Sequence, residues 1–300
     1  MTYSVRIGGT TFPNPVLAAS GTWGFGLSFR RVSDRLGGIV TKGITLEPRD
    51  GNPPPRIHEF PGGIINSVGL ENPGLEAFRR QVLPAMDKLK CRVIVNVAGF
   101  TPGEYATVVG RLRSRRVDAF ELNVSCPNVR TGGGAFGQSP RMVETITKAA
   151  RSRTNKTLIV KLTANFVDPV DTARAAVNGG ADAVTLINTL HGLALGQDGR
   201  PFLGGRSGGI SGPALRPFAL FCVDRVAAKV DVPIIGSGGI MSGQDALDFM
   251  NAGACLVQVG TASLVDPDAA LRVWLELKQT VPGSRASAWE DIVGRTRRFD

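Results

Sequence analysis

Apolar, β-rich runs alternate with amphipathic stretches along almost the whole chain, and this alternation limits the possible folds more than any other feature. Strands are predicted at Val16–Ala19, Gly38–Thr41, Arg92–Val97, Ala119–Asn123, Leu158–Leu162, Ala183–Asn188, Pro233–Gly236 and Cys255–Val259. Helical patterns occupy Pro73–Lys88, Gly103–Arg113, Arg141–Arg151, Pro169–Asn178, Ala214–Ala228, Gly243–Asn251 and Pro267–Lys278. Near-continuous apolar strands are typical of parallel sheets that helices cover. The pattern predicts an α/β protein with a single (β/α)8 TIM barrel domain over residues 1–300; a doubly wound open sheet is the alternative.

The start of the chain has a different pattern. Tyr3–Phe12 carries a Gly8-Gly9 pair between two short β-rich runs, which is typical of a tight β-hairpin turn. We expect this hairpin to cover the bottom of the barrel.

Three connections between strands and helices are long and rich in Gly, Pro and Asn. They span Lys42–Asn72, Val124–Pro140 and Thr189–Gly212, and each follows the carboxyl end of a predicted strand. Long loops in a compact domain are usually functional, and barrel enzymes place their active sites at this end. The sequence therefore places the site at the C-terminal face.

Polar residues occur where five of the predicted strands end. They are Lys42, Asn96, Asn123, Lys161 and Asn188. One such residue is weak evidence, because it could be a satisfied buried amide. Five on consecutive strands point to a polar barrel mouth, and the two lysines imply an anionic ligand, because an unpaired buried ammonium is costly.

The last two predicted strands end in glycine-rich turns. These are Gly236-Ser237-Gly238-Gly239-Ile240 and Val259-Gly260-Thr261-Ala262. Glycines let backbone N–H groups approach an anion closely, and the loops after strands seven and eight are the recurrent phosphate site of barrels. A phosphate is therefore expected here, with tight turns alone as the alternative.

Cys126 lies in the long loop after the fourth predicted strand, just before Gly132-Gly133-Gly134. A thiol of ordinary pKa, about 8.5, is partly ionised near neutral pH and can act as a base or a nucleophile. A nucleophilic triad needs a histidine, and the chain has only His58 and His191. A structural thiol is the remaining alternative, and catalysis is the role that we expect.

Charge and composition narrow the list of partners. The net charge of +10 comes from scattered basic residues without interleaved aromatics, so no nucleic-acid site is expected. The four cysteines are widely spaced, so no metal site is expected either. The chain shows neither a membrane-spanning run nor a signal-peptide layout, and a cytoplasmic location is expected.

The run Glu121-Leu122-Asn123-Val124-Ser125-Cys126-Pro127-Asn128 resembles the catalytic-loop signature of class 1 dihydroorotate dehydrogenases. The resemblance covers essentially the whole chain. It includes Ala19-Ser20-Gly21, Thr41-Lys42-Gly43, the run from Asn66 to Gly74, Asn188-Thr189, the run from Ser211 to Ala214, and both terminal glycine motifs.

This resemblance implies an FMN cofactor and assigns residues to it and to the substrate. The flavin would contact Ser20, Lys42, Gly43, Asn96, Asn123, Lys161, Ile187, Gly212, Gly238, Gly239, Gly260 and Thr261. The pyrimidine would contact Lys42, Asn66, Ser67, Val68, Gly69, Leu70, Asn123, Asn128, Asn188 and Thr189. Cys126 would remove a proton from C5 of dihydroorotate while a hydride leaves C6 for the flavin, in the pathway to pyrimidines.

The resemblance is strongest to class 1B, because of Asn72-Pro73-Gly74 and the long glycine-rich loop after Cys126. It implies a homodimer that binds an electron-transfer subunit with FAD and a 2Fe–2S cluster, in a heterotetramer with NAD⁺ as final acceptor. The alternatives are a fumarate-using class 1A enzyme, a dihydropyrimidine dehydrogenase-type FMN barrel, and a barrel that binds FMN or phosphate without catalysis.

Overall fold

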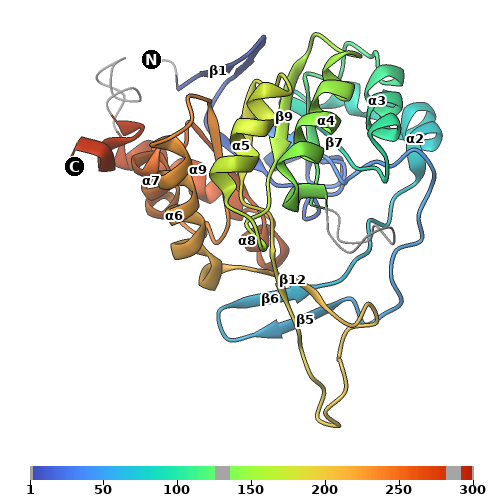
Figure 1. The fold of residues 1–300 in the computed structure, drawn as a ribbon. Helices are drawn as coiled ribbons and strands as arrows, with labels where there is room; N and C mark the ends of the chain where they lie inside the picture. Colours follow the sequence, from blue (N-terminus) through green and yellow to red (C-terminus); the bar gives the residue numbers. More distant parts are fainter. Residues whose placement is uncertain (1–2, 126–135, 282–291, 299–300) are drawn as a thin grey trace.

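The computed structural model describes residues 3–125, 136–281 and 292–298. Its centre is a closed barrel of parallel strands in the order β3-β4-β7-β8-β9-β10-β13-β14 (Figure 1). These strands are β3 (Val16–Ala18), β4 (Gly38–Val40), β7 (Arg92–Val97), β8 (Ala119–Asn123), β9 (Thr157–Lys161), β10 (Ala183–Leu186), β13 (Ile234–Ser237) and β14 (Leu256–Val259). Each predicted strand is present with its ends shifted by at most two residues. The TIM barrel prediction is confirmed, and the open sheet is excluded.

Helices surround the barrel. They are α1 (Arg30–Ser33), α2 (Gly74–Ala77), α3 (Pro102–Arg111), α4 (Pro140–Arg151), α5 (Pro169–Asn178), α6 (Arg216–Ala227), α7 (Gly243–Ala252), α8 (Thr261–Val265) and α9 (Ala269–Thr280). The side chains of Thr101, Ser139 and Asp168 accept backbone hydrogen bonds at the starts of α3, α4 and α5, each of which has a proline in its first turn. The sequence therefore marks these helix starts locally.

The predicted helix Pro73–Lys88 is broken into three pieces. After α2 the chain forms a π-helical turn, η1 (Phe78–Val82), and then a 3-10 turn, η2 (Pro84–Lys88). Pro84 has no backbone N–H and its ring displaces the carbonyl one turn earlier, so a regular α-helix cannot run through it. Further 3-10 turns are η3 (Phe136–Gln138), η4 (Pro213–Leu215) and η5 (Arg295–Arg298).

The predicted N-terminal hairpin consists of β1 (Val5–Ile7) and β2 (Thr10–Phe12), joined at Gly8-Gly9. Ile7 and Phe12 are fully buried. They form one apolar cluster with a residue from each barrel strand: Leu17, Val40, Ile94, Ala119, Ile159, Ala183, Ile235 and Leu256. The hairpin therefore closes the barrel bottom, as expected.

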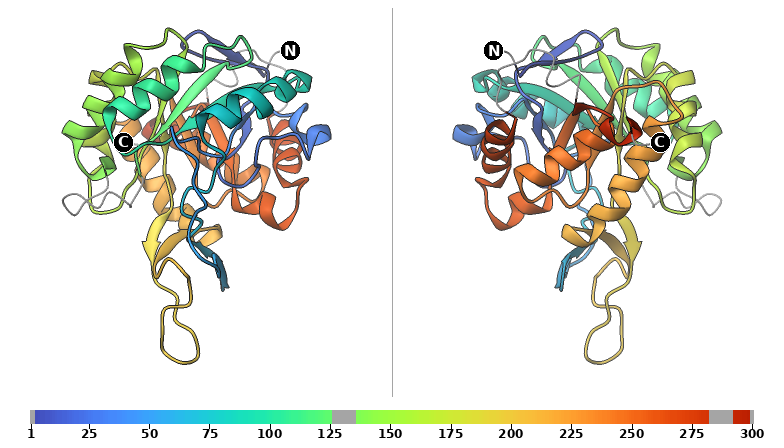
Figure 2. Two further views of the ribbon diagram at one scale, coloured as in Figure 1. Left: turned by 90° about the vertical axis from the view of Figure 1, so that its right-hand side faces the viewer. Right: turned by 90° about the vertical axis from the view of Figure 1, so that its left-hand side faces the viewer.

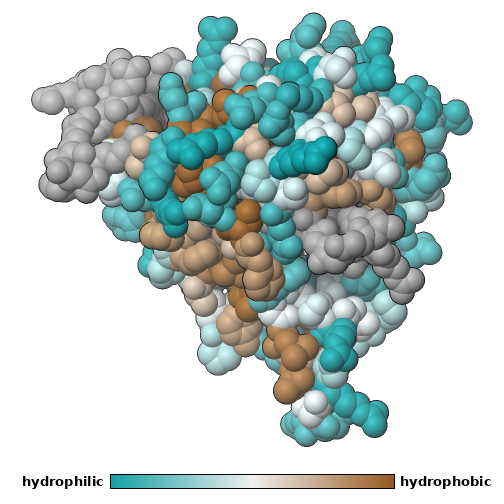
Figure 3. Space-filling model, in the orientation of Figure 1, coloured by the Kyte–Doolittle hydropathy of each residue, from teal (hydrophilic) through white to brown (hydrophobic). Residues whose placement is uncertain are grey.

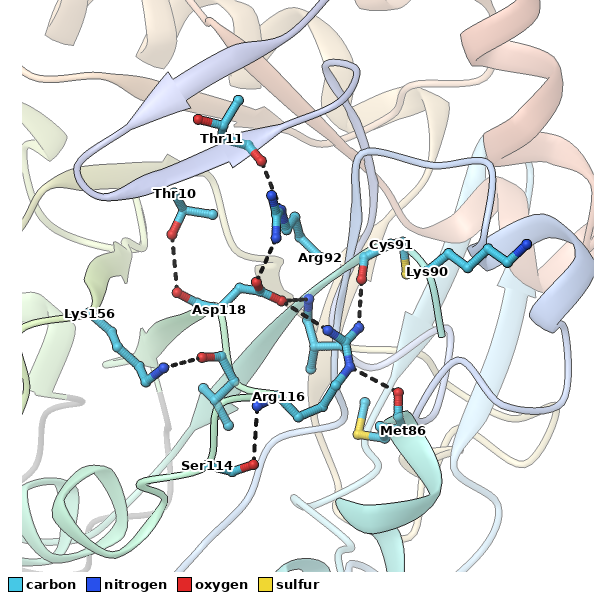
Figure 4. Close-up of polar contacts among 12 residues, drawn as sticks. Thr10, Thr11, Met86, Lys90, Cys91, Arg92, Ser114, Arg116, Asp118 and Lys156 are labelled. Atoms are coloured by element: carbon cyan, nitrogen blue, oxygen red, sulfur yellow. Dashed lines mark hydrogen bonds and ion pairs between the residues drawn. The ribbon is translucent and has the colours of Figure 1, made fainter. Parts of the chain in front are cut away.

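Asp118, directly before β8, organises the polar contacts at this end of the barrel (Figure 4). Its carboxylate accepts hydrogen bonds from the backbone N–H of Val93 at 2.8 Å, from Arg92 at 3.1 Å and from Arg116 at 3.3 Å. Arg92 also donates to the carbonyl of Thr11 at 2.8 Å. These bonds connect the hairpin to β7 and β8.

A second sheet projects away from the barrel (Figures 1 and 2). It is antiparallel in the order β11-β12-β6-β5, from β5 (Ile57–Phe60), β6 (Gly63–Asn66), β11 (Leu190–Gly192) and β12 (Gly208–Ser211). The sequence predicts only long connections here. The strands are three or four residues long, and β6 pairs with β12 across more than a hundred residues, so no local pattern reveals the pairing.

Candidate active site

The barrel interior changes from apolar to polar one layer above the cluster that the hairpin covers. Residues two apart along a strand face the same side. Two residues beyond each strand's member of that cluster, the chain carries Ala19, Lys42, Asn96, Glu121, Lys161, Thr185, Ser237 and Gln258. Seven of these eight are polar or charged, so the polar mouth begins in this layer.

A hydrogen-bonded network of buried side chains crosses this layer. Lys161 Nζ donates to Gln258 Oε1 at 3.3 Å and to Ser20 Oγ at 3.5 Å. Gln258 Nε2 donates to Glu121 Oε2 at 2.5 Å. The network holds the ammonium group of Lys161, which is 6% exposed, beside Gln258 and Ser20 at the end of β9.

Asn96 has one end of its amide bonded and the other end free. Its Nδ2 donates to Glu121 Oε1 at 2.8 Å, whereas its buried Oδ1 accepts no hydrogen bond from the described residues. A Cβ on Gly43 would lie 2.9 Å from this oxygen. A buried carbonyl oxygen without a partner is costly, so it is ready to accept a hydrogen bond from a ligand.

Asn123 and Asn188 lie together at the ends of β8 and β10. Asn188 Nδ2 donates to Asn123 Oδ1 at 3.2 Å, and the backbone N–H of Ser125 donates to the same oxygen at 3.2 Å. Asn188 Oδ1 accepts from the backbone N–H of Thr189 at 2.8 Å. The Asn123 carbonyl oxygen accepts a hydrogen bond from Tyr105 Oη at 2.7 Å.

The glycine segments converge from three strands. Gly212, Gly238 and Gly239 have positive φ, and a Cβ on Gly239 would lie 2.8 Å from the carbonyl oxygen of Gly212. Thr261 Oγ1 donates to Ser211 Oγ at 2.9 Å, which brings the turn after β14 beside them. The backbone N–H of the buried Ile187 donates to the carbonyl of Ser237 at 2.9 Å. The turns after β12, β13 and β14 therefore lie close together, with little room for side chains between them.

The predicted pyrimidine segment runs from the end of β6 toward Lys42. Asn66 Nδ2 donates to the carbonyl of Gly209 at 3.2 Å, and Ser67 Oγ accepts from Asn52 Nδ2 at 2.9 Å. The backbone N–H of Asn52 donates to the carbonyl of Val68 at 3.0 Å. Gly69 and Leu70 both have positive φ, so this turn is held in an unusual backbone conformation.

Lys42 forms an ion pair that the sequence did not predict. Its Nζ lies 3.5 Å from Glu71 Oε2, an oxygen that also lies 2.8 Å from Arg56 Nη1. All three side chains are between 30% and 45% exposed, so the pairing is weak enough for a ligand carboxylate to replace it.

Cys126 and Asn128 lie outside the described residues. The other three thiols are hardly ionised near neutral pH, because burial raises the pKa of Cys91 to about 12 and the pKa of Cys222 and Cys255 to about 11. His58 packs against Phe202 with ring centroids 4.6 Å apart, and it lies with His191 on the projecting sheet.

Comparison with known proteins agrees with this geometry. The family model described as "Dihydroorotate dehydrogenase" matches residues 2–281. A "Dihydroorotate dehydrogenase B (NAD(+)), catalytic subunit" from Alkaliphilus oremlandii is 47% identical, with 97% of each chain covered. The protein of the same name from Thermoanaerobacter pseudethanolicus is 46% identical, with 98% of each chain covered. The crystal structure of an Eimeria tenella DHODH in complex with ferulenol has a TM-score of 0.80 at 26% identity, covering 99% of this chain and 89% of that one.

The chain belongs to the dihydroorotate dehydrogenase family. It is an oxidoreductase that acts in pyrimidine biosynthesis, and the B-type relatives carry NAD⁺ in their name. Enzymes of this family are generally flavin-dependent. The free Asn96 Oδ1, the fixed Lys161 cation and the crowded glycine turns fit a planar, anionic group of this kind.

The sequence pattern did not predict every member of this layer. Two of the unpredicted residues, Glu121 and Gln258, belong to the hydrogen-bonded network that reaches Lys161. Both lie two residues beyond an apolar interior position of the same strand, Ala119 and Leu256. A search for polar residues at this spacing would have found them.

Two structural findings bear on the other expectations. No helix among the described residues is long and apolar enough to cross a membrane. Across residues 3–125, 136–281 and 292–298, no group of three or more His, Cys, Asp or Glu side chains could hold a metal ion.

Proposed function

We propose that this chain, as one barrel domain over residues 1–300, oxidises dihydroorotate to orotate with bound FMN. The observation that carries the proposal is the polar layer of the barrel, where Lys161 is fixed beside Gln258 and Asn96 presents a free buried oxygen. The convergent glycine turns next to this layer supply backbone N–H groups for the FMN phosphate.

The FMN contacts are proposed as the sequence predicts them. They comprise Ser20, Lys42, Gly43, Asn96, Asn123, Lys161, Ile187, Gly212, Gly238, Gly239, Gly260 and Thr261. When bound, FMN supplies a two-electron acceptor for a hydride. Lys161 adds positive charge beside the flavin ring, which favours the negative charge of the reduced form.

The substrate is held by amides and a lysine. Asn123 and Asn188 are already oriented by each other, so their remaining donors and acceptors can match those of a dihydropyrimidine ring. Lys42 faces the carboxylate of dihydroorotate when Glu71 releases it. Asn66, Ser67, Val68, Gly69, Leu70, Asn128 and Thr189 complete the proposed pyrimidine contacts.

Cys126 is the proposed base. Its thiolate takes the proton from C5, the C5–C6 double bond forms, and the hydride leaves C6 with both electrons. The product is orotate. The two histidines of the chain, His58 and His191, lie on β5 and β11 of the projecting sheet, which supports a base rather than a histidine-activated nucleophile as the role of the thiol.

Electrons are proposed to leave through a second protein. The B-type relatives are named catalytic subunits, which supports a partner for this chain as well. We assign that role to a subunit with FAD and a 2Fe–2S cluster that passes electrons to NAD⁺, bound to a homodimer of this chain. Exposed apolar side chains on α6 and on α8, among them Phe221 and Val265, are candidates for assembly contacts. Figure 3 shows apolar side chains gathered on the face of the molecule that carries α6.

The test is an acceptor assay with FMN-loaded protein. Dihydroorotate should bleach the flavin and reduce a dye, whereas NAD⁺ reduction should require the co-expressed partner. Turnover with fumarate would show a class 1A enzyme, and oxidation of dihydrouracil in place of dihydroorotate would show the dihydropyrimidine type. A colourless protein that takes up no FMN would overturn the cofactor assignment.

A further inference from the structure

Glu121 is a fully buried acid in the middle of the polar layer. Its two carboxylate oxygens accept three hydrogen bonds: Oε1 from Asn96, and Oε2 from Gln258 and from Thr185 at 2.9 Å. A carboxylate only accepts hydrogen bonds, and all three of these neighbours donate to it. Burial of an acid is costly even when the acid is hydrogen-bonded. The apolar cluster below this layer already supplies a packed barrel interior, so we expect a role of Glu121 other than stability.

The carboxylate decides which way both neighbouring amides point. Because Asn96 must donate to Glu121, its Oδ1 is the atom left free. Because Gln258 must also donate to Glu121, its Oε1 is the atom that faces Lys161 Nζ. An amide reverses its donor and acceptor ends when it turns over, so both orientations depend on Glu121.

We propose that Glu121 is a positioning residue, which presents Asn96 Oδ1 as an acceptor to a ring N–H of the cofactor and holds Lys161 beside the same ring through Gln258. The inference rests on the proposed binding of FMN. The oxidised flavin ring has one N–H group, at N3, and it is the donor that this buried oxygen would accept. Glu121 itself touches neither cofactor nor substrate.

Substitution Glu121→Gln tests this role with almost no change of volume. The new amide presents one acceptor and one donor, so either Asn96 or Gln258 faces a donor and turns over. If Asn96 turns, an N–H group meets the flavin N–H; if Gln258 turns, its N–H meets Lys161. In both cases the FMN dissociation constant rises, by about tenfold or more.

The paired exchange Glu121→Gln with Gln258→Glu should rescue binding. The amide at 121 then donates to the carboxylate at 258 and still accepts from Asn96, while Lys161 keeps an acceptor. We expect most of the lost FMN affinity to return. Thr147→Val serves as the control for stability alone, because it removes a buried hydroxyl bond to Val143 in α4, away from the barrel mouth.

The measurements are the FMN dissociation constant from flavin fluorescence, the flavin midpoint potential and the melting temperature of the apoprotein. In Glu121→Gln we expect weaker binding and a shifted midpoint potential, whereas Thr147→Val lowers only the melting temperature. 3-Methyl-FMN lacks the ring N–H, so it should bind the wild type about tenfold more weakly than FMN does. In Glu121→Gln the difference in affinity between FMN and 3-methyl-FMN should be smaller.

Three results separate the possible failures. If the wild type takes up no FMN, the proposed function and this inference both fall. If it binds FMN and is bleached by dihydroorotate while Glu121→Gln keeps the wild-type affinity, potential and methylation penalty, only the inference falls. If the paired exchange binds FMN no better than Glu121→Gln, Glu121 acts through stability and not through the amides.

Discussion

At the scale of single residues, the site depends on side chains whose orientation is set by their neighbours. Asn96 and Gln258 point as they do because of Glu121, and Asn188 is held by Asn123. The sequence identified Asn96, Asn123, Lys161 and Asn188, because polar residues at strand ends are visible in a single chain. It could not show which end of each amide is free, since that depends on partners from other strands.

The proposed base gives a prediction with a defined pH dependence. Cys126→Ser should lower the rate of dihydroorotate oxidation at neutral pH by about a hundredfold or more, because a hydroxyl is ionised far less than a thiol. The residual rate should rise with pH, since the ionised fraction of the hydroxyl grows. Stopped-flow bleaching between pH 6 and pH 10 measures this, and FMN absorbance gives the loaded fraction. If Cys126→Ser bleaches the flavin at the wild-type rate at neutral pH, Cys126 is not the base.

The thiols themselves should differ in reactivity. At pH 8 a thiol whose pKa is raised to about 11 or 12 is ionised to about one part in a thousand or less, so Cys91, Cys222 and Cys255 should react slowly. Cys126 should give a single fast phase with an aromatic disulfide reagent, and Cys126→Ser should abolish it. All remaining thiols should react in denaturant. A fast phase that survives in Cys126→Ser would contradict this assignment.

At the scale of elements, the sequence predicted the strands and helices that have a local pattern and missed those that depend on long-range pairing. The barrel strands were predicted within two residues, because buried parallel strands are apolar on both faces. The predicted helix Pro73–Lys88 is interrupted at Pro84, which is a local cause. The apolar periodicity continues through this position and therefore did not indicate the break. The projecting sheet was missed, because Gly208–Ser211 pairs with a segment far away in the sequence and has no apolar face of its own.

The hairpin and its anchor should contribute measurably to stability. Asp118→Asn places an N–H group against donors from Val93, Arg92 or Arg116, and should lower the free energy of unfolding by about 1–3 kcal/mol. Urea denaturation of the apoprotein measures the change. Asp198→Asn is the matched control, because its pairing with Arg200 at 3.8 Å is largely exposed, and it should change stability by less than about 0.5 kcal/mol. Equal effects of the two substitutions would show that Asp118 does not anchor the hairpin.

At the scale of the whole molecule, the fold separates stability from chemistry along the barrel axis. The hairpin and its apolar cluster fill one end, and the polar layer begins two residues further along each strand. This division was partly predictable from the sequence, because strand ends, glycine turns and long loops share one face. The outer surface carries no comparable signal, since exposed apolar residues such as Val265 have no periodic pattern that identifies a partner.

That outer surface leads to a prediction about assembly. Val265 is 78% exposed at the end of α8, and Leu264 beside it is 47% exposed, so a partner that covers this helix would bury both. Val265→Asp should place a charge in that contact and lower both the assembled fraction in sedimentation and the rate of NAD⁺ reduction with the partner present, by about tenfold. Dye reduction by the chain alone should not change, because it needs no assembly. Leu275→Asp on α9, at a 39% exposed apolar residue, is the control and should leave assembly intact. If Val265→Asp assembles and reduces NAD⁺ like the wild type, the contact lies elsewhere and α8 is only a solvated end of the barrel wall.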